Sequence, residues 1–414
     1  MKYRNRLKAV LSVALLCGAL AACGMDPAQT PSESIQQPSV SEYTDDLIDA
    51  QTAFTLNLLR EATKENPGEN VLLSPYSAMQ SLAMTANGAS GNTLSEMTQV
   101  LGLPPDQLNE ALCAQRIAMP DSRACKFSLA NALWVNAHAG ALRDAFQQTN
   151  ETFYNAKITV APFSQSTVKD INKWCKKQTD GMIPEILTDQ STDHPAMHLL
   201  NAIAFDGEWD EKFAEEPQAY SFWAYDGSEQ VAMMMCGTEK YYLSDEKATG
   251  FLKYYKDGKY AFAAIKPNND VLPDAYLENL TAAELHSLLV NITEPRSVTI
   301  GLPKFRWESS NDLIPLLKNM GMNAAFDPDA ADFSMMTENQ EQLWISDVLQ
   351  KAVIEVDTNG TKAVAVTKTS VESSLYDENT GVFLNRPFIY MIVETENMTP
   401  VFAGVINTMF DAHY

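Results

Sequence analysis

Hydrophobic residues recur at helical spacing in the first half of the chain. Apolar side chains fall on one face of a helix between Leu47 and Ala62, and Pro67-Gly68 ends this element. Ser74-Pro75 is a typical helix start. Further helices are predicted over residues 74–86, 93–101 and 167–177, and a first strand over residues 129–136.

The later half favours strands. They are predicted over residues 199–205, 231–235, 260–266, 298–307, 348–357, 388–394 and 401–408. Helical insertions are predicted around Leu285 and over residues 313–320. Helices followed by strands indicate an α+β fold with large, mainly antiparallel sheets. Several strands are apolar throughout, so we expect both of their faces to be covered.

Small and larger or charged residues alternate with period two over residues 361–372, but this segment has no evident partner strand. Its first face is small and uncharged, with Thr361, Ala363, Ala365, Thr367, Thr369 and Val371. Its second face holds all the charge, with Lys362, Val364, Val366, Lys368, Ser370 and Glu372. This pattern predicts a strand with one buried and one wet face. Because no side chain on the small face is large enough to anchor a core, we expect a conformational switch that can enter a sheet.

The first 23 residues have the character of an export signal. A basic start precedes an apolar run that is too short to span a bilayer, and small residues lead to Cys23. This segment resembles a bacterial lipoprotein signal, which implies that Cys23 is lipidated; an ordinary secretion signal is the alternative. Residues 24–44 are rich in Pro, Ser and Gln and predict a flexible tether. Residues 45–414 contain no second linker and are expected to form one domain.

Charge and cysteine content narrow the classes of partner. Without the signal the chain keeps 26 Lys and Arg against 53 Asp and Glu, a net charge of −27. Such acidity disfavours nucleic acid and favours encounter with basic proteins. Cys113 and Cys125 are candidates for a disulfide outside the cell, whereas Cys175 and Cys236 are expected to be buried free thiols.

Motifs for an enzyme are missing from the sequence. It contains no G-x-S-x-G, H-E-x-x-H, P-loop or G-x-G-x-x-G pattern. His194 and His198 are four residues apart, but Pro195 spoils regular helical presentation and no acidic partner follows from the spacing. We therefore expect neither catalysis nor a metal or other cofactor.

Eight short motifs in order resemble the serpin family over nearly all of residues 45–414. They are Asn70-Val-Leu-Leu-Ser74-Pro75-Tyr-Ser77, Asn131-Ala132-Leu-Trp134, Ile171-Asn172-Lys-Trp174 with Thr179-Asp-Gly181, Asn201 with Phe205-Asp-Gly-Glu-Trp209, Leu302-Pro303-Lys304-Phe305, Gly321-Met322 with Ala331-Asp332-Phe333-Ser334, Lys351-Ala352-Val353-Ile354-Glu355-Val356, and Asn385-Arg-Pro387-Phe388. The resemblance implies a serpin fold of three β-sheets and about nine helices, with an exposed reactive-centre loop.

The same resemblance assigns roles to residues. Gly360 and Thr361 to Thr367 would form the hinge of the loop, where family logic asks for small residues, and Thr361, Ala363, Ala365 and Thr367 meet that demand. Lys362, Val364 and Val366 belong to the outward face. Ser74, Ser77 and Asn201 would lie where the central sheet must part, and Trp209 near the top of that gap. Helix capping is an equally good reading of Ser74.

Three positions depart from the family pattern. Thr358 stands where the hinge usually has an acid, and Val364 and Val366 replace alanines, although β-branching suits a strand. Gln350 stands where many members have a histidine bonded to the serine helix. A glutamine both donates and accepts, so it can replace that link.

A serpin-like mechanism follows from strand addition. A serine protease would attack the loop and form an acyl-enzyme, and insertion of the loop would trap it covalently. Counting 14 residues on from Gly360 puts the cut at Ser374, with Leu375 next, whereas counting back from Pro387 puts it near Tyr376. Ser374 suits an elastase-like target, and Leu375 or Tyr376 a chymotrypsin- or subtilisin-like one. A non-inhibitory serpin, serving as a cleavable surface substrate or binding protein, is the alternative.

Taken together, these features predict a secreted monomer. A lipid at its N-terminus would hold it at the cell surface or outer membrane.

Overall fold

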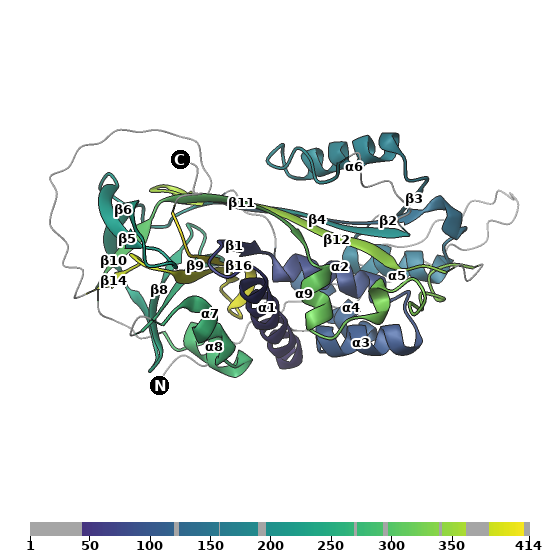
Figure 1. Cartoon of the computed structure of the whole chain (residues 1–414), viewed down its shortest axis with the longest axis horizontal. Coiled ribbons are helices and arrows are strands. Elements are labelled where there is room, and N and C mark those ends of the chain that lie inside the picture. Colours follow the sequence, from purple (N-terminus) through teal and green to yellow (C-terminus); the bar gives the residue numbers. More distant parts are fainter. Residues whose placement is uncertain are drawn as a thin grey trace, which may run out of the picture. The chain divides into compact units, whose positions relative to one another are not determined.

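Nine α-helices and three sheets make up the part of the chain that the computed structural model describes, which is residues 44–119, 124–156, 158–188, 196–268, 271–292, 297–338, 342–361 and 381–409 (Figure 1). The helices are α1 (Asp45–Glu65), α2 (Pro75–Ala86), α3 (Gly91–Leu101), α4 (Pro105–Ala118), α5 (Asp144–Tyr154), α6 (Gln165–Gln178), α7 (Pro273–Glu278), α8 (Ala282–Val290) and α9 (Ile314–Asn319). The α+β class and the three-sheet arrangement predicted from the sequence are confirmed.

The central sheet has the strand order β11-β12-β13-β4-β2-β3. Its strands are β2 (Cys125–Asn136), β3 (Ile158–Ala161), β4 (Met197–Glu208), β11 (Phe305–Asp312), β12 (Ile345–Val356) and the short β13 (Gly360–Thr361). β11 pairs antiparallel with β12, and β2 pairs antiparallel with β4. β12 and β4 pair with each other in parallel.

The two remaining sheets lie at the side of the molecule away from α2 to α5 (Figure 1). One has the order β1-β16-β15-β9-β8-β7, from β1 (Val71–Leu73), β7 (Tyr241–Ser244), β8 (Ala248–Tyr254), β9 (Tyr260–Pro267), β15 (Phe388–Glu394) and β16 (Thr399–Ile406). The other has the order β14-β10-β6-β5, from β5 (Gln218–Trp223), β6 (Glu229–Glu239), β10 (Val298–Pro303) and β14 (Val382–Phe383). β15 and β16 are buried along their whole length, as their apolar sequences predict.

Helices cover both faces of the central sheet. α6 lies over one face, where Val168, Ile171 and Cys175 pack on Trp134 and Leu200 of the sheet (Figure 1). α2 lies under the other face, and all twelve of its residues are buried. Side chains at alternate positions of β2, β4 and β12 therefore meet either α6 or α2.

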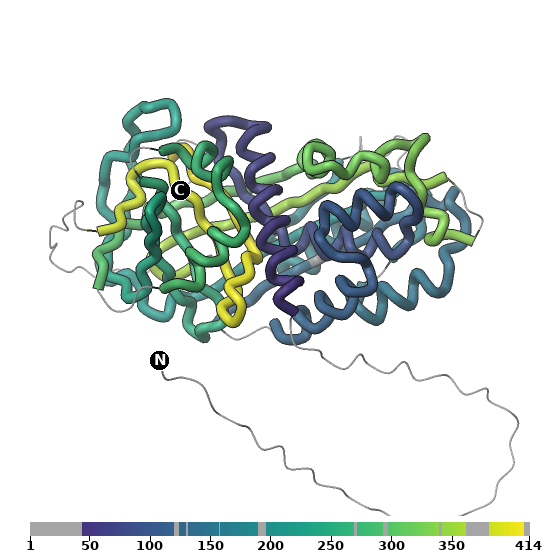
Figure 2. Tube along the Cα trace, turned by 90° about the horizontal axis from the view of Figure 1, so that it is seen from below, coloured from purple at the N-terminus to yellow at the C-terminus, as the bar shows by residue number. Residues whose placement is uncertain are grey.

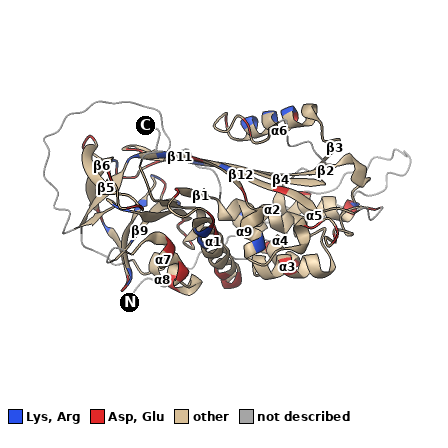
Figure 3. Cartoon of the chain, in the orientation of Figure 1, with Lys and Arg blue, Asp and Glu red and all other residues tan. Residues whose placement is uncertain are grey.

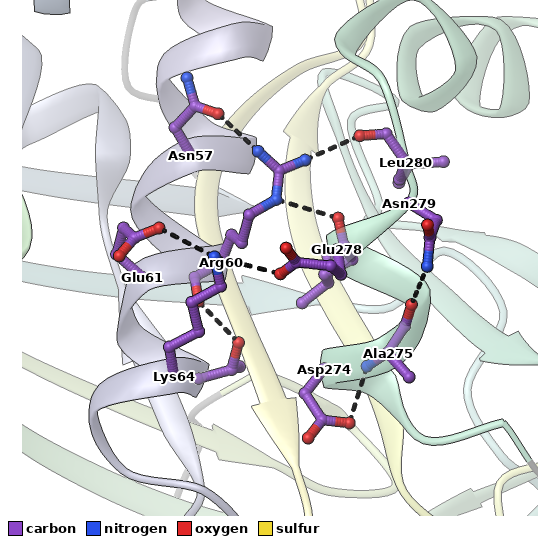
Figure 4. A network of polar contacts seen from close by, with 11 residues as sticks. Asn57, Arg60, Glu61, Lys64, Asp274, Ala275, Glu278, Asn279 and Leu280 are labelled. Carbon is purple, nitrogen blue, oxygen red and sulfur yellow. Dashed lines mark hydrogen bonds and ion pairs between the residues drawn. The ribbon is translucent and has the colours of Figure 1, made fainter. Parts of the chain in front are cut away.

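α1 runs between the strands and the helices α2 to α5 (Figure 2). Arg60 of α1 fixes it to the end of α7: Nε donates to the carbonyl of Leu277 at 3.1 Å and Nη2 to that of Leu280 at 2.8 Å (Figure 4). Leu277 lies in the last turn of α7 and Leu280 just beyond it. Lys64 adds an ion pair to Glu278 at 3.1 Å.

The structure differs from, or adds to, the sequence-based picture in three places. The predicted strand over residues 298–307 is two strands, β10 and β11, which belong to different sheets. The extended segment is interrupted at Lys304, whose N–H donates to Met233 O. Helices α4 and α5 were not predicted, although Pro105 begins α4 and proline is favoured in a first helical turn. Cys113 and Cys125, which the sequence offered as candidates for a disulfide, are both buried and form no disulfide, since one lies on α4 and the other at the start of β2.

Candidate functional site

The parallel pair of β12 and β4 is the seam of the central sheet. The pair runs in register from Asp347 opposite His198 to Val353 opposite Ala204, and a register shift separates this run from the pairing of Ile345 with Met197. Beyond Val353 and Ala204 the two strands part, and β13 occupies the opening, which we call the upper end of the seam. There β13 pairs antiparallel with both neighbours, with Thr361 opposite Val356 on one side and Gly207 on the other.

A tight turn leads from β12 into β13. The Asp357 carboxylate accepts from the N–H groups of Asn359 at 2.7 Å and Gly360 at 3.1 Å, and Asp357 N–H donates to Gly360 O at 2.9 Å. A Cβ at position 360 would lie only 2.0 Å from Gly207 O. Position 360 therefore requires glycine because the two backbones touch.

An aromatic cluster closes the upper end of the seam from the interior. The indole of Trp209 stacks on the ring of Tyr255, with centroids 4.6 Å apart, and its Nε1 donates to Asp357 O at 2.8 Å. Tyr255 Oη and Thr361 Oγ1 share a hydrogen bond of 2.5 Å. Burial raises the pKa of the Tyr255 hydroxyl, so it stays protonated and available as a donor. The first residues of the loop are thus held by backbone and side-chain contacts.

A buried ion pair lies beside this cluster. Lys253 Nζ is 2.5 Å from Glu239 Oε1, and it sits 4.5 Å from the centre of the Phe213 ring and 5.5 Å from that of Trp209. Burial raises the pKa of Glu239, and the Lys253 ammonium opposes that rise. The pair joins β8 to β6 under the opening.

Amide side chains form a row across four strands at the middle of the seam. We call this set the amide row: Asn311 on β11, Gln350 on β12, Asn201 on β4 and Asn131 on β2 are successive register partners. Gln350 and Asn201 are 1% and 0% exposed. Asparagine is disfavoured inside strands, so a polar line through a buried sheet has a specific purpose.

The amide row is bonded to the start of α2 and to β1. Gln350 Oε1 accepts from Ser74 N–H at 2.7 Å, and Gln350 Nε2 donates to Ser74 O at 2.9 Å. Ser77 Oγ lies 2.7 Å from Asn131 Oδ1 and 2.9 Å from Asn201 Oδ1. Asn311 Nδ2 donates to Leu72 O at 3.0 Å. The row therefore ties both strands of the seam to one helix terminus.

Ser74 has two structural roles at this place. It is the N-cap of α2, where its Oγ accepts from Ser77 N–H at 3.4 Å, and the same hydroxyl donates to Val401 O at 2.7 Å. Both the capping role and the contact with the seam, which the sequence left as alternatives, are present.

A histidine–carboxylate contact spans the lower part of the seam. His198 on β4 and Asp347 on β12 are register partners, with Nδ1 and Oδ2 2.6 Å apart. The His198 side chain is 2% exposed, and the ring of Phe163 lies 4.5 Å from it, centroid to centroid. Any strand that enters the seam to its full depth must separate these two side chains.

The predicted site residues thus fall into two groups along one seam. Ser74, Ser77, Asn201 and Gln350 meet at the amide row, whereas Trp209, Gly360 and Thr361 meet at the upper end. The other predicted residues lie outside the described part of the chain; they are Cys23, Lys362, Ala363, Val364, Ala365, Val366, Thr367, Ser374, Leu375 and Tyr376. Within the described residues there is no helix long and apolar enough to cross a membrane and no cluster of metal-binding side chains.

Sequence reasoning missed several residues of the site. Asn131 was noticed only as part of a motif, and Asn311, Tyr255, Asp357 and Asp347 were not singled out. For the asparagines a signal existed, because an amide inside a predicted buried strand contradicts β propensity. Tyr255 and Asp347 gave no comparable signal, since their partners are far away in the chain.

Three sheets around this seam, with α6 and α2 on opposite faces of the central one, define the class of fold. A family profile described as Serpin (serine protease inhibitor) matches residues 49–409. The chain belongs to the serpin family, whose members are in general inhibitors of proteases rather than enzymes.

Relatives and solved structures agree with this assignment. An uncharacterized serpin-like protein of Thermococcus kodakarensis is 30% identical over 371 residues, covering 86% of this chain and 84% of that protein. Iripin-5 of Ixodes ricinus is 28% identical, covering 89% and 96%. The crystal structure of the thermophilic serpin tengpin in the native state is 34% identical with a TM-score of 0.82, covering 89% and 96%, whereas its latent state gives a TM-score of 0.77.

Proposed function

We propose that this serpin inhibits serine proteases as a suicide substrate. The protease would cleave the reactive-centre loop and form an acyl-enzyme with it. The cleaved loop would then enter the seam between β12 and β4 and carry the protease along. The observation that carries this proposal is β13, the first two residues of the loop already paired between the two strands of the seam.

The direction of the strands favours insertion. A segment that follows β12 through a tight turn must run antiparallel to β12. Because β4 is parallel to β12, the same segment is also antiparallel to β4. Full insertion would replace one parallel interface by two antiparallel ones, which are slightly more stable per residue.

The register of β13 predicts where each loop residue would come to rest. Thr361 opposes Gly207, and each step forward on the loop is one step back on β4. Ten residues on, Val371 would oppose Met197, the first residue of β4. A cut at Ser374, Leu375 or Tyr376 therefore leaves a strand long enough to fill the seam from end to end.

The same register gives the small face of the loop suitable surroundings, whereas on the other face Lys368 would oppose the buried Leu200 under α6. Thr361, Ala363, Ala365, Thr367, Thr369 and Val371 would oppose Gly207, Phe205, Ile203, Asn201, Leu199 and Met197 in turn. Thr367 would therefore reach the amide row between Asn201 and Gln350, where its hydroxyl can bond. On the other face, Val364 and Val366 would oppose Ala204 and Ala202, and Ala202 already belongs to the apolar cluster under α6.

The free energy gained by inserting the loop into the sheet would be large enough to trap the protease. About a dozen new ladder hydrogen bonds at a net ~0.5–1.5 kcal/mol each total roughly 6–18 kcal/mol. This is comparable to the ~5–15 kcal/mol that stabilises a typical domain. A gain of this size is able to distort a tethered protease.

The residues around the expected cut favour a target protease other than a trypsin-like enzyme, because no Lys or Arg lies between Thr369 and Asn385. Ser374 supports an elastase-like target, and Leu375 or Tyr376 a chymotrypsin- or subtilisin-like one. The signal-like segment ending at Cys23 supports display of the inhibitor on a lipid anchor at the cell surface. Labelling of the chain by a radioactive fatty acid, lost in Cys23→Ser, would test the anchor.

The decisive experiment is incubation of the protein with a chymotrypsin-fold elastase. We expect a covalent complex that survives denaturing electrophoresis. Thr361→Arg would place a charge at the buried start of the loop and should give cleavage without complex. The matched control Lys362→Ala changes the outward face and should keep the complex. Quantitative cleavage of the unmodified protein without complex would instead support a non-inhibitory serpin.

A further inference from the structure

A cavity of about 430 Å³ lies beside the central sheet, outside the seam. Its walls come from α2, α4, β2 and α6 and from the segment after α5, so five separate parts of the chain meet there. Aromatic and apolar side chains of Tyr76, Phe127, Leu129 and Trp174 provide much of the lining. A space of this size is within the range that holds small organic ligands.

Two buried nitrogen donors, on residues that line the cavity, lack partners within the described part of the chain. Gln80 Nε2 makes no hydrogen bond there, although the side chain is only 2% exposed. Arg116 Nε is likewise buried without a partner, and the contacts of its Nη2 with described residues are long, 3.4 Å to Phe153 O and 3.7 Å to Cys113 Sγ. Arg116 forms no ion pair with any residue of the described ranges. Leaving a buried donor unsatisfied is unfavourable, so both donors call for an acceptor.

The charge around the cavity is positive on a chain that is otherwise acidic. The described lining residues include no aspartate or glutamate, although the chain contains 53 of them. Trp174 and Gln178 in the wall belong to α6, which carries the exposed lysines Lys169, Lys173, Lys176 and Lys177, visible as blue segments in Figure 3. Such a field raises the local concentration of anions.

From these donors and walls we propose that the cavity binds a small organic carboxylate with a flat apolar body. Its carboxylate accepts hydrogen bonds from the guanidinium of Arg116 and the amide of Gln80, and its apolar part packs between Phe127, Leu129 and Trp174. A carboxylate matches an arginine better than a neutral acceptor does, because charge-assisted hydrogen bonds are about twice as strong. The site uses no residue of the loop and none of the bonds between Gln350 and Ser74, although Asn131 of the amide row lies in its lining.

Calorimetric titration of the full chain with 3-phenylpropionate tests the proposal. The matched probe 3-phenylpropanamide has almost the same shape and no charge. At about 10 mM, a ligand that binds with only about −4 kcal/mol would be largely bound, so weak binding is detectable. We expect saturable binding of the carboxylate and at least about tenfold weaker binding of the amide. Equal binding of the two probes, or no binding of either, would overturn the site.

Variants locate the binding. Arg116→Leu should weaken binding of 3-phenylpropionate about tenfold or more, and Gln80→Leu should weaken it several-fold. Arg306→Leu is the control, because Arg306 of β11, whose side chain is 40% exposed, is not among the residues that line the cavity. An equal loss in Arg306→Leu would mean non-specific attraction and refute the proposal. Circular dichroism checks that each variant is folded, and the comparison of carboxylate with amide on the unmodified protein decides the question if Arg116→Leu does not fold.

Discussion

The side-chain amide of Gln350 bonds both backbone polar groups of Ser74. It accepts from the Ser74 N–H at 2.7 Å and donates to the Ser74 carbonyl at 2.9 Å. One side chain on β12 thereby fixes the first residue of the helix that underlies the seam. A glutamine has no proton to gain or lose near neutral pH. The link between seam and helix is therefore insensitive to pH, unlike one made by a histidine.

Removal of this link should destabilise the intact protein. Gln350→Ala leaves the buried N–H of Ser74 without a partner, which costs about 1–3 kcal/mol, whereas the Ser74 carbonyl keeps its bond from Ala78 N–H at 3.1 Å. We expect the free energy of unfolding in denaturant to fall by roughly 1–3 kcal/mol. The control Gln148→Ala removes an exposed glutamine of α5 and should change it by less than about 0.5 kcal/mol. Equal effects of the two changes would contradict the role of Gln350.

The His198–Asp347 contact should stabilise the intact form only. In the proposed inserted form, Ser370 lies between these two side chains and the contact no longer exists. Asp347→Asn should therefore lower the stability of the intact protein by about 1 kcal/mol, a small value because Asp347 is 33% exposed. The melting temperature of the loop-cleaved protein should stay unchanged. A similar loss in both forms would show that the loop does not reach this depth.

Gly360 should be irreplaceable because of its contact with Gly207. Gly360→Ala puts a methyl group 2.0 Å from Gly207 O, so β13 must leave the seam. We expect faster amide hydrogen exchange at Thr361 and an altered Trp209 fluorescence. Gly237→Ala is the control, because the added methyl meets only the side chain of Phe213 at 3.3 Å. Unchanged exchange at Thr361 in Gly360→Ala would show that β13 is not held as described.

The cysteines should form no disulfide, and the buried thiols of Cys125 and Cys175 should be inert in the folded protein. Burial raises the pKa of Cys125 to about 12 and that of Cys175 to about 11. At pH 8 iodoacetamide should therefore leave them unmodified until the chain unfolds, because only thiolates react rapidly. After unfolding without reductant, Cys113, Cys125, Cys175 and Cys236 should all be labelled. If Cys113 and Cys125 resisted iodoacetamide after unfolding and became labelled only with a reductant, the two cysteines would be paired in a disulfide.

The same shifts have a consequence for stability at high pH. A folded-state pKa above the ordinary value of 9.0 means that the folded protein retains the thiol proton after the unfolded chain has lost it. The contribution to stability is complete below about pH 9 and is lost as the pH rises toward 12. Replacing Cys125 by Ala should reduce this alkaline loss.

Ser374 should decide the target if the cut follows it. Ser374→Arg would offer a side chain that trypsin-like enzymes accept, so inhibition should move from elastase to trypsin. The matched changes Leu375→Arg and Tyr376→Arg test the neighbouring bonds. Complex formation rates with both proteases would be compared for the three variants. An unchanged profile in Ser374→Arg would place the cut elsewhere.

The sequence was sufficient for the fold class because its patterns are local. Apolar spacing found α1, and the Ser74-Pro75 start found α2. The sequence was not sufficient where the structure depends on distant partner strands. The interruption at Lys304 separates β10, which pairs with β6, from β11, which pairs with β12, and no residue near 304 indicates this. The four members of the amide row lie up to 219 positions apart in the chain, from Asn131 to Gln350, so only the register of the sheet brings them together.

β13 also bears on the kinetics of the proposed switch. In strand addition the slow event is normally nucleation, in which a free segment must find its register and close a loop before any ladder bond rewards it. Here Gly360 and Thr361 are already in register with both neighbours. After cleavage only propagation would remain, one residue at a time down the seam, and its rate would depend on how fast β12 and β4 separate rather than on a search.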